Sequence, residues 1–330
     1  MSLHDMGATM RFAPWMFCAA MALLGAPAVA QQDYPNKPIR VIAGSGPGGI
    51  SDIFIRVMGD ELAKRWGQPL IVENRAGGAF NIAGRACAEA APDGYTICIL
   101  PNEPMTYNKH LFKNMAYDPD TQIAPVTNLF FMTQALVINS KLNVKSVDEL
   151  VAHAKAHPKS LNYTAPAAAL VLFIETLNRQ HGLDMVRVPF RSGGESVNGV
   201  LSGVSPITFL GIGNFMPHIR AGTINGLIVD GDQRTPLLPD VPAITEIGYR
   251  EPLTRSYFGL YAPVGMSKAQ MSKIADTMRE IASDPAFRSR NLLERGLEPV
   301  FNAPDDFAAF LAQDRSTAKR VVDAAGLQPQ

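Results

Sequence analysis

Short apolar runs rich in β-branched residues alternate with helical patterns along most of this chain. The first alternation is the most compact, because a strand pattern at residues 39–43 and a helical pattern at residues 51–66 are separated only by a short loop rich in glycine. Strands that alternate with helices in this way indicate βαβ units, in which largely parallel sheets carry helices on their faces. The sequence therefore predicts an α/β fold.

The alternation occurs in two passes, separated by a longer extended stretch at residues 126–139. A capping box at residues 146–149, Ser-Val-Asp-Glu, opens the first helix of the second pass, and this helix ends before Pro158. About 150 residues per domain is typical, so a chain of 330 residues favours two domains. The remaining strands are predicted at residues 70–73, 95–100, 161–164, 185–189, 207–210, 224–229 and 257–261, and the remaining helices at residues 81–90, 268–283 and 304–325.

The first thirty residues have the features of an export signal. Arg11 precedes an apolar run at residues 12–24, and the small residues Ala28 and Ala30 form a cleavage site before Gln31. The run is too short and too poorly flanked for a membrane span, and no other stretch approaches about twenty apolar residues. We therefore expect a mature protein outside the cytoplasm, with residues 1–30 removed.

Two cysteines, Cys87 and Cys98, remain after removal of this signal. An exported protein can oxidise such a pair, but no sequence rule brings their Cα atoms within disulfide range. We therefore expect two buried free thiols and keep a disulfide as the alternative.

Charge and composition exclude several classes of function. Thirty basic residues balance thirty acidic ones, so no net field attracts nucleic acid or anionic lipid over long range. Apolar residues make up 47% of the chain and charged residues 18%, which is enough apolar material for sizeable cores. The composition favours a folded protein with no nucleic-acid partner.

The sharpest local motif is Gly-Ser-Gly-Pro-Gly-Gly at residues 44–49, between the first predicted strand and helix. It matches the G-x-G-x-x-G pattern of dinucleotide-binding sites. Asp52 argues against a dinucleotide, because its charge in the first helical turn opposes a pyrophosphate, and exported proteins seldom meet nicotinamide cofactors. We expect instead that free N–H groups at this helix start receive a small anion, most simply a carboxylate, directly or through water. A plain connection without a ligand remains the alternative.

Two further glycine-rich loops follow predicted strands and precede predicted helices, at residues 75–81 and 191–196. The carboxyl ends of strands in two α/β halves commonly face a shared ligand cleft. Three such loops therefore indicate that a ligand is captured in a cleft that closes around it.

Motifs for catalysis do not occur in the sequence. We find no G-x-S-x-G, H-E-x-x-H or C-x-x-C pattern. His153 and His157 are spaced to share a metal on one helix face, but a solvated helix face without a metal is favoured. Neither an enzyme nor a bound cofactor is therefore expected.

A set of motifs with specific order and spacing runs from Tyr34 to about Leu327. They are Tyr-Pro-Asn-Lys-Pro-Ile-Arg at 34–40, Pro-Gly-Gly at 47–49 with Asp52 and Arg56, Gly-Gln-Pro at 67–69, Val-Glu-Asn-Arg at 72–75, Asn-Ile at 81–82, Ala-Pro-Asp-Gly-Tyr-Thr at 91–96, Val-Pro-Phe-Arg at 188–191, Pro-His-Ile-Arg-Ala-Gly at 217–222, Leu-Pro-Asp-Val-Pro at 238–242 and Phe-Gly-Leu-Tyr-Ala-Pro at 258–263. Together they resemble the substrate-binding proteins of tripartite tricarboxylate transporters, the TctC or Bug family.

This resemblance implies a periplasmic binding protein of the type II-like fold, in which two α/β domains joined by a hinge hold a small carboxylate between them. The expected division makes residues 31–130 and 255–330 one discontinuous domain and residues 131–254 the second. The resemblance implies no catalysis. The expected partners are the carboxylate and the membrane subunits of a tripartite tricarboxylate-type transporter, and the binding protein itself is expected to be a periplasmic monomer.

The resemblance also implies where the ligand contacts lie. Family members hold the ligand carboxylate with main-chain groups and ordered waters of the Pro-Gly-Gly loop, and with contacts from the facing domain. Each charge-assisted hydrogen bond to a carboxylate contributes roughly 1.5–3 kcal/mol. The expected ligand-binding residues are Ser45, Pro47, Gly48, Gly49, Asp52, Phe80, Asn81, Asn102, Ala165, Ala167, Ser192 and Gly193.

Several positions depart from the usual pattern of this family. Ala-Pro-Ala-Ala-Ala-Leu at residues 165–170 replaces a ligand loop rich in Gly and Ser, and Phe80 replaces a common Gly. Tyr257 stands for a common Trp, and Ser205-Pro206 for a common Val-Asp. Fewer polar groups and an added ring favour a ligand with an apolar or aromatic body over citrate. Two other functions stay open, a sensor component that presents its ligand to a membrane partner and an exported dinucleotide-binding oxidoreductase.

Overall fold

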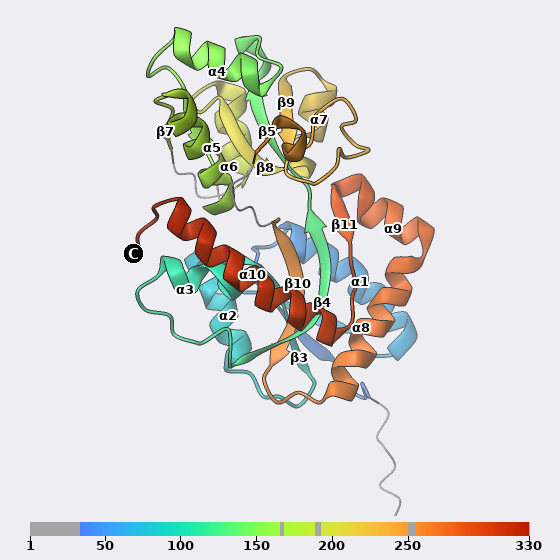
Figure 1. Ribbon diagram of the computed structural model, residues 1–330. Helices are drawn as coiled ribbons and strands as arrows, with labels where there is room; N and C mark the ends of the chain where they lie inside the picture. The colour runs from blue at the N-terminus through green and yellow to red at the C-terminus, as the bar shows by residue number, and fades with distance from the viewer. Residues whose placement is uncertain (1–33, 166–167, 189–192, 250–254, 330) are drawn as a thin grey trace, which may run out of the picture. The chain divides into compact units, whose positions relative to one another are not determined.

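The computed structural model describes residues 34–165, 168–188, 193–249 and 255–329 (Figure 1). The predicted export signal and its cleavage site lie outside the described residues, as do Ala167 and Ser192 of the predicted ligand set. None of the helices in the described part of the chain combines the length and the apolar character that a membrane span requires. Residues 37–330 form one compact unit, and the expected domain boundaries stay predictions.

Six strands form the first sheet, in the order β11-β4-β10-β3-β1-β2. Strand β1 (Ile39–Ala43) pairs in parallel with β2 (Leu70–Asn74) and β3 (Thr96–Pro101). Strand β10 (Tyr257–Pro263) lies antiparallel between β3 and β4 (Ile123–Met132), and β11 (Leu297–Pro299) pairs antiparallel with β4 at the edge. This sheet therefore joins strands from the two ends of the described chain.

Five strands form the second sheet, in the order β7-β6-β8-β5-β9. Strand β6 (Asn162–Thr164) pairs in parallel with β7 (Val186–Arg187) and β8 (Ile207–Gly211). Strand β5 (Gln134–Asn139) lies antiparallel between β8 and β9 (Ile224–Val229). All strands of this sheet come from the middle of the chain. Helices and strands together make a mixed α/β structure, as the sequence predicts.

The expectation of largely parallel sheets is wrong where the chain passes between the two sheets. The single extended stretch predicted at residues 126–139 is two strands, β4 in the first sheet and β5 in the second, with Thr133 between them. Two parallel strands that neighbour each other must be joined by a crossover, usually a helix. Strand β5 follows β4 directly, without such a helix, and it pairs antiparallel with both of its neighbours in the second sheet. In the described residues, each antiparallel pair involves β4, β5 or β10.

The helices predicted with bounds, at residues 51–66, 81–90, 268–283 and 304–325 and from residue 146, lie close to those positions. The predicted capping box is half formed, because Ser146 Oγ accepts a hydrogen bond from the Glu149 N–H at 3.1 Å, whereas the Glu149 carboxylate accepts one from the Lys145 N–H at 2.7 Å. The helices are α1 (Ile50–Trp66), α2 (Asn81–Ala88), α3 (Asn108–Leu111), α4 (Val147–Ala156), α5 (Ala168–His181), α6 (Gly193–Ser202), α7 (Met216–Arg220), α8 (Lys268–Ser283), α9 (Pro285–Asn291) and α10 (Pro304–Ala324).

The first sheet has an apolar layer on both of its faces. On one face, Phe307 of α10 packs edge-to-face against Tyr257 of β10 with ring centroids 6.1 Å apart, and Figure 1 shows α10 lying across β10 and β4. On the other face, Phe54 of α1 meets Phe130 of β4 at 4.9 Å, and Phe130 meets Phe258 at 5.8 Å. Successive side chains of β10 thus enter opposite layers, as strand geometry requires.

The second sheet is also covered on both faces. Phe173 of α5 packs edge-to-face on Phe209 of β8 at 5.5 Å, and α4 contributes to the same cluster. On the opposite face, Val200 of α6 and Phe215 join a second cluster. Helix α10 also contacts this half of the fold, because Leu172 of α5 is buried in one cluster with residues of α10.

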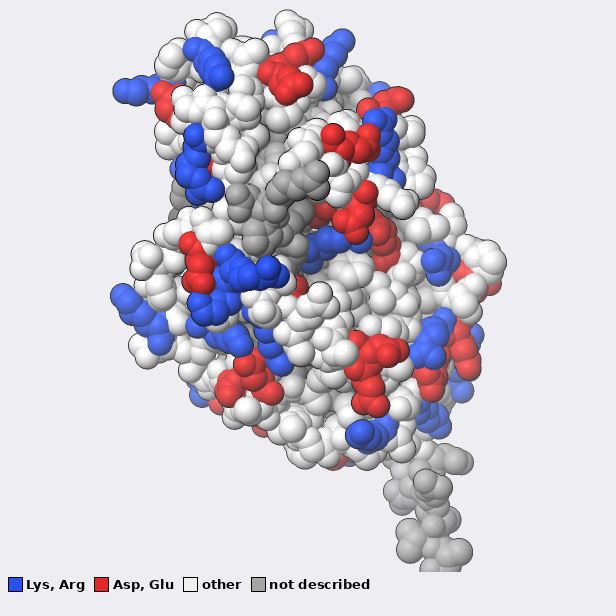
Figure 2. Space-filling model, viewed as in Figure 1, with Lys and Arg blue, Asp and Glu red and all other residues white. Residues whose placement is uncertain are grey.

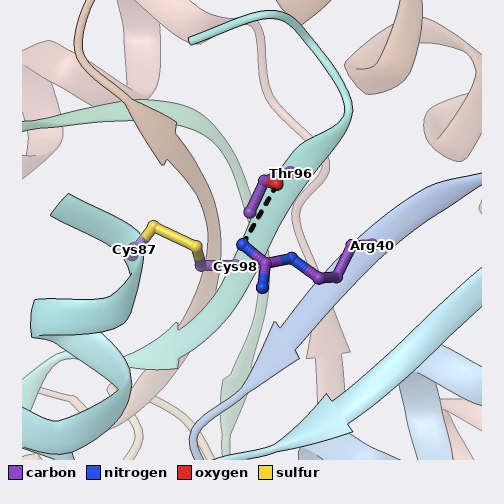
Figure 3. Close-up of a disulfide and its surroundings, with 4 residues drawn as sticks. All are labelled: Arg40, Cys87, Thr96 and Cys98. Carbon is purple, nitrogen blue, oxygen red and sulfur yellow. Dashed lines mark hydrogen bonds between the residues drawn. A yellow bond between two sulfur atoms is a disulfide. The ribbon is translucent and has the colours of Figure 1, made fainter. Parts of the chain in front are cut away.

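Cys87 of α2 and Cys98 of β3 form a disulfide, with their Cα atoms 6.0 Å apart (Figure 3). The expectation of two free thiols is therefore wrong. The pairing depends on how α2 packs on β3, and this distance is not visible in a spacing of eleven residues. Beside the disulfide, Arg40 of β1 donates a hydrogen bond to Thr96 Oγ1 at 3.4 Å (Figure 3). The disulfide ties α2 to the interior of the first sheet.

We expect replacement of both cysteines by alanine to lower the free energy of unfolding by roughly 2–3 kcal/mol, because the bond closes a short loop of the unfolded chain. The measurement is urea denaturation of protein purified from an oxidising compartment. Dithiothreitol should lower the midpoint of the wild type and leave that of the double variant unchanged. A wild-type midpoint that does not respond to the reductant would contradict the bond.

Candidate functional site

The glycine-rich loop at residues 44–49 makes a tight connection from β1 to α1. Gly48 has a φ of 78°, which favours glycine, and the Gly49 N–H donates to the Gly46 carbonyl at 3.0 Å. A Cβ atom added to Gly49 would lie 2.7 Å from the Cβ of Ser45, so a larger residue does not fit there. The Ser51 hydroxyl donates to Ser45 Oγ at 2.7 Å and closes the loop onto the first turn of the helix.

Asp52 lies beneath this loop, and its two carboxylate oxygens bind different partners. One oxygen accepts the Gly48 N–H at 2.9 Å, and the other accepts Arg56 Nε and Asn74 Nδ2, each at 2.9 Å. Asn74 also donates to the Ser45 carbonyl at 2.9 Å. The Asp52 side chain is therefore buried, and its charge is compensated by Arg56 rather than left to oppose an anion.

The hydrogen bonds to Asp52 determine its protonation state. Burial alone would raise the pKa of Asp52, but the hydrogen bonds from Arg56, the Gly48 N–H and Asn74, with the positive charge of Arg56, lower it below the ordinary value. Asp52 is therefore ionised at neutral pH and holds the loop as a fixed acceptor. Its predicted direct contact with the ligand stays a prediction, while its structural bonds within the loop are observed.

The second glycine-rich loop has an unusual backbone. Four successive residues have positive φ angles: Gly77 at 113°, Gly78 at 55°, Ala79 at 49° and Phe80 at 68°. Such values are uncommon for Ala and costly for a bulky residue such as Phe. Asn108 compensates this cost, since its Nδ2 donates to the Ala79 carbonyl at 2.8 Å and to Asn81 Oδ1 at 2.7 Å.

The strained loop places the ring of Phe80 over the first glycine-rich loop. A Cβ atom added to Gly44 would lie 2.9 Å from Phe80 Cδ1, so the ring needs a glycine beneath it. Backbone strain persists only where the surrounding structure supports it, and it concentrates at functional sites. The position of Phe80 is therefore a specific feature of this loop.

Ser45, Gly48 and Phe80 meet in a pocket of about 490 Å³, a volume in the range of small-molecule sites. Its walls come from α1, the end of β4, the end of β8 with the segment after it, the start of β10 and the turn before β11. Most of the lining side chains are apolar. The remaining lining residues are Ile50, Ile53, Met132, Thr133, Leu210, Gly211, Gly213, Asn214, Met216, Phe258, Glu294, Arg295, Gly296 and Leu297.

Other residues predicted for the site do not line this pocket. Asn81 Oδ1 is engaged by Asn108 and by the Tyr117 hydroxyl at 3.2 Å, and Asn102 is buried with its Oδ1 unpartnered within the described residues. Ala165 is buried, and its carbonyl accepts a hydrogen bond from Arg187. The other members outside the lining are Pro47, Gly49, Asp52 and Gly193, the last of which begins α6.

Sequence reasoning missed the residues after β8 and before β11. Their signal in the sequence is weak, because it consists of two glycines, Gly213 and Gly296. In the structure, a Cβ atom on Gly213 would lie 2.9 Å from the Arg295 carbonyl oxygen, and one on Gly296 would lie 2.5 Å from Ile212. The segments are about eighty residues apart in sequence and meet only in the folded chain.

The lining of the pocket carries one charged residue of each sign, Glu294 and Arg295. Figure 2 shows Lys and Arg side chains interspersed with Asp and Glu over the face in view. Within the described residues, no three His, Cys, Asp or Glu side chains are grouped to hold a metal ion. His153 and His157 stack with ring centroids 4.5 Å apart on α4. Ligand selection in the pocket must therefore come from local contacts rather than from a broad field of one sign.

Two mixed sheets covered by helices, with a pocket lined by both, match the fold of solved periplasmic binding proteins. The chain belongs to the TctC family, described as the tripartite tricarboxylate transporter family receptor, whose profile matches residues 54–327. This confirms the family and the fold class expected from the sequence motifs. Members of this family are periplasmic solute-binding proteins and not enzymes, so the dinucleotide-dependent oxidoreductase is ruled out.

Three relatives illustrate this membership. The protein BugT of Bordetella pertussis is 29% identical over 302 residues, which cover 89% of this chain and 91% of BugT. The R. palustris protein Rpa4515, solved with adipate, is 26% identical with a TM-score of 0.81 and covers 90% of this chain and 100% of its own. MatC from Rhodopseudomonas palustris, solved with bound malate, is 26% identical with a TM-score of 0.75 and covers 88% of this chain and 100% of its own.

We expect Asp52→Asn to lower the free energy of unfolding at pH 7 by roughly 1–3 kcal/mol, because the loop loses a charged acceptor. The folded pKa of Asp52 is lowered, so its contribution is present above the ordinary Asp range and is lost as pH falls through the folded pKa. The difference between the two proteins should therefore shrink in acid. Urea denaturation at pH 7 and at lower pH measures it.

The matched control for this variant is Asp60→Asn. Asp60 is on the same helix but exposed, so this change should have little effect at either pH. Equal effects of the two substitutions at pH 7 would contradict the role assigned to Asp52.

Proposed function

We propose that this protein captures a small carboxylate with an apolar or aromatic body in the pocket beside Phe80, and delivers it to a tripartite tricarboxylate-type membrane transporter. The observation that carries the proposal is the ring of Phe80, which a strained loop holds at the wall of a mostly apolar pocket. The delivery step rests on membership of a transporter receptor family.

The carboxylate part of the proposal rests on the relatives and on the loop at residues 44–49. Two relatives of 26% identity were solved with adipate and with malate, both of which are carboxylates. In this chain, Ser45 and Gly48 place a hydroxyl and a short main-chain segment at the pocket wall, directly before α1. The Gly48 N–H is donated to Asp52, so the Ser45 hydroxyl is the group of this loop that should face the acid group, at a helix start that favours a negative charge.

The apolar part of the proposal rests on the remaining walls. Phe80 and Phe258 present rings, and Leu210, Met216 and Leu297 present aliphatic or thioether side chains. Few side-chain donors are directed at the ligand, since Asn214 Nδ2 donates to the Gly211 carbonyl at 3.0 Å and Thr133 Oγ1 donates to Glu298 at 2.8 Å. A contact between two aromatic rings contributes about 0.5–1.5 kcal/mol in addition to the burial of their apolar area. Such walls favour an aromatic acid over citrate.

The test is a thermal-shift screen of the mature protein with benzoate, adipate, malate, citrate and amino acids. A ligand at about 100 times its dissociation constant should add roughly 2.7 kcal/mol to the free energy of unfolding. We expect a carboxylate to raise the melting temperature, and benzoate to raise it more than citrate does. No response to any acid would contradict carboxylate capture, and a much larger response to citrate would contradict the apolar body.

The variant Phe80→Gly tests the ring directly. We expect it to weaken benzoate binding about tenfold relative to malate, because roughly 1.4 kcal/mol of ring contact is lost. Isothermal titration calorimetry gives the ratio of the two affinities. The control is Ala79→Gly, which relieves a neighbouring positive φ without removing a ring, and should leave the ratio unchanged. An unchanged ratio in Phe80→Gly would contradict the role of the ring.

A further inference from the structure

Arg295 is held in place between two parts of the fold. It ends a short 3-10 helix (Leu293–Arg295) between α9 and β11, and its N–H donates to the Leu292 carbonyl at 3.0 Å. The next residue, Gly296, has a φ of 71° and accepts a hydrogen bond from the Thr133 N–H at 2.9 Å. The Arg295 carbonyl approaches Gly213 so closely that an added Cβ atom would lie 2.9 Å away. The backbone at Arg295 is thus fixed from two sides.

Arg295 also lies beside the start of α1. It lines the main pocket together with Ser45 and Gly48, and it lines a smaller adjoining hollow together with Ile50 and Ile53 of the first helical turns. These residues follow directly on the loop at 44–49. Arg295 therefore shares the end of the pocket where the acid group of a ligand is expected.

Arg295 forms no ion pair with an acidic side chain within the described residues. Arg56, which is nearer to the loop in sequence, pairs with Asp52 at 2.8 Å, and Arg75 pairs with Glu73. Glu294 lines the same pocket and keeps its negative charge, since its carboxylate accepts a hydrogen bond from a neutral donor, the Ser289 hydroxyl, at 2.9 Å. Of the lining residues in the described chain, Arg295 alone carries a positive charge.

We propose that Arg295 is a specificity-determining residue whose side chain pairs with the ligand carboxylate in this pocket. This assignment rests on the proposed capture of a carboxylate. A guanidinium group offers forked donors that match a carboxylate and keeps its charge at every physiological pH. Arg295 thus selects acids over neutral analogues of the same shape, while the apolar walls select the body of the ligand.

The test compares each acid with its amide, benzoate with benzamide and adipate with adipamide, by calorimetry on the mature protein. We expect Arg295→Gln to weaken acid binding about fivefold and to leave amide binding within about twofold, because an exposed charge pair contributes near the upper end of the surface range. Added NaCl should weaken acid binding to the wild type more than to this variant. Arg295→Lys, which keeps the charge, should retain part of the acid preference.

The matched control is Arg290→Gln on α9, which removes the same charge outside the pocket lining. We expect this control to bind acid and amide as the wild type does. Equal losses in both Gln variants, or equal losses of acid and amide in Arg295→Gln, would overturn the assignment while carboxylate capture stands. A wild type that binds no acid would instead overturn the proposed function, and the role of Arg295 with it.

Discussion

A single buried carboxylate organises the end of the pocket at which we place the ligand acid group. Asp52 binds the Gly48 N–H, Arg56 and Asn74, and Asn74 extends the network to the Ser45 carbonyl. Burying a carboxylate is costly unless it is paired and fully hydrogen-bonded, and here all its partners lie within one loop, one helical turn and one neighbouring strand. The buried Asp52 carboxylate therefore stabilises the conformation of the loop at residues 44–49, which lines the pocket.

The second loop depends on anchoring of a different kind. The positive φ angles from Gly77 to Phe80 are stabilised by Asn108, and the helix that follows is tied to β3 by the disulfide between Cys87 and Cys98. Strain at one segment persists when its two ends are held by more stable structure. Rigid attachment on either side thus allows one ring, that of Phe80, to be presented to the pocket in a conformation that Phe rarely adopts.

A buried acid, Asp230, lies where the chain passes from the first sheet to the second. Asp230, directly after β9, accepts the Gln134 N–H at 2.8 Å at the start of β5. Burial raises the pKa of Asp230 to about 7, against a smaller lowering by that hydrogen bond and by Arg255. A carboxyl group that is partly neutral near pH 7 lowers the cost of burial at this crossing, next to Thr133 and the turn that carries Arg295.

The order of strands and helices, the family motifs and the tight loop at residues 44–49 are readable from the sequence, because periodicity, glycine content and capping residues act over a few neighbours. Ser45, Gly48 and Phe80 are predicted for the site from the family resemblance, and they line one pocket. Sequence could not reveal the antiparallel strands at the crossing, the disulfide, the inward bonds of Asp52 or the approach of Arg295 to Gly213. These depend on distances between segments that are far apart along the chain, and only the packing of both sheets with their helices sets such distances.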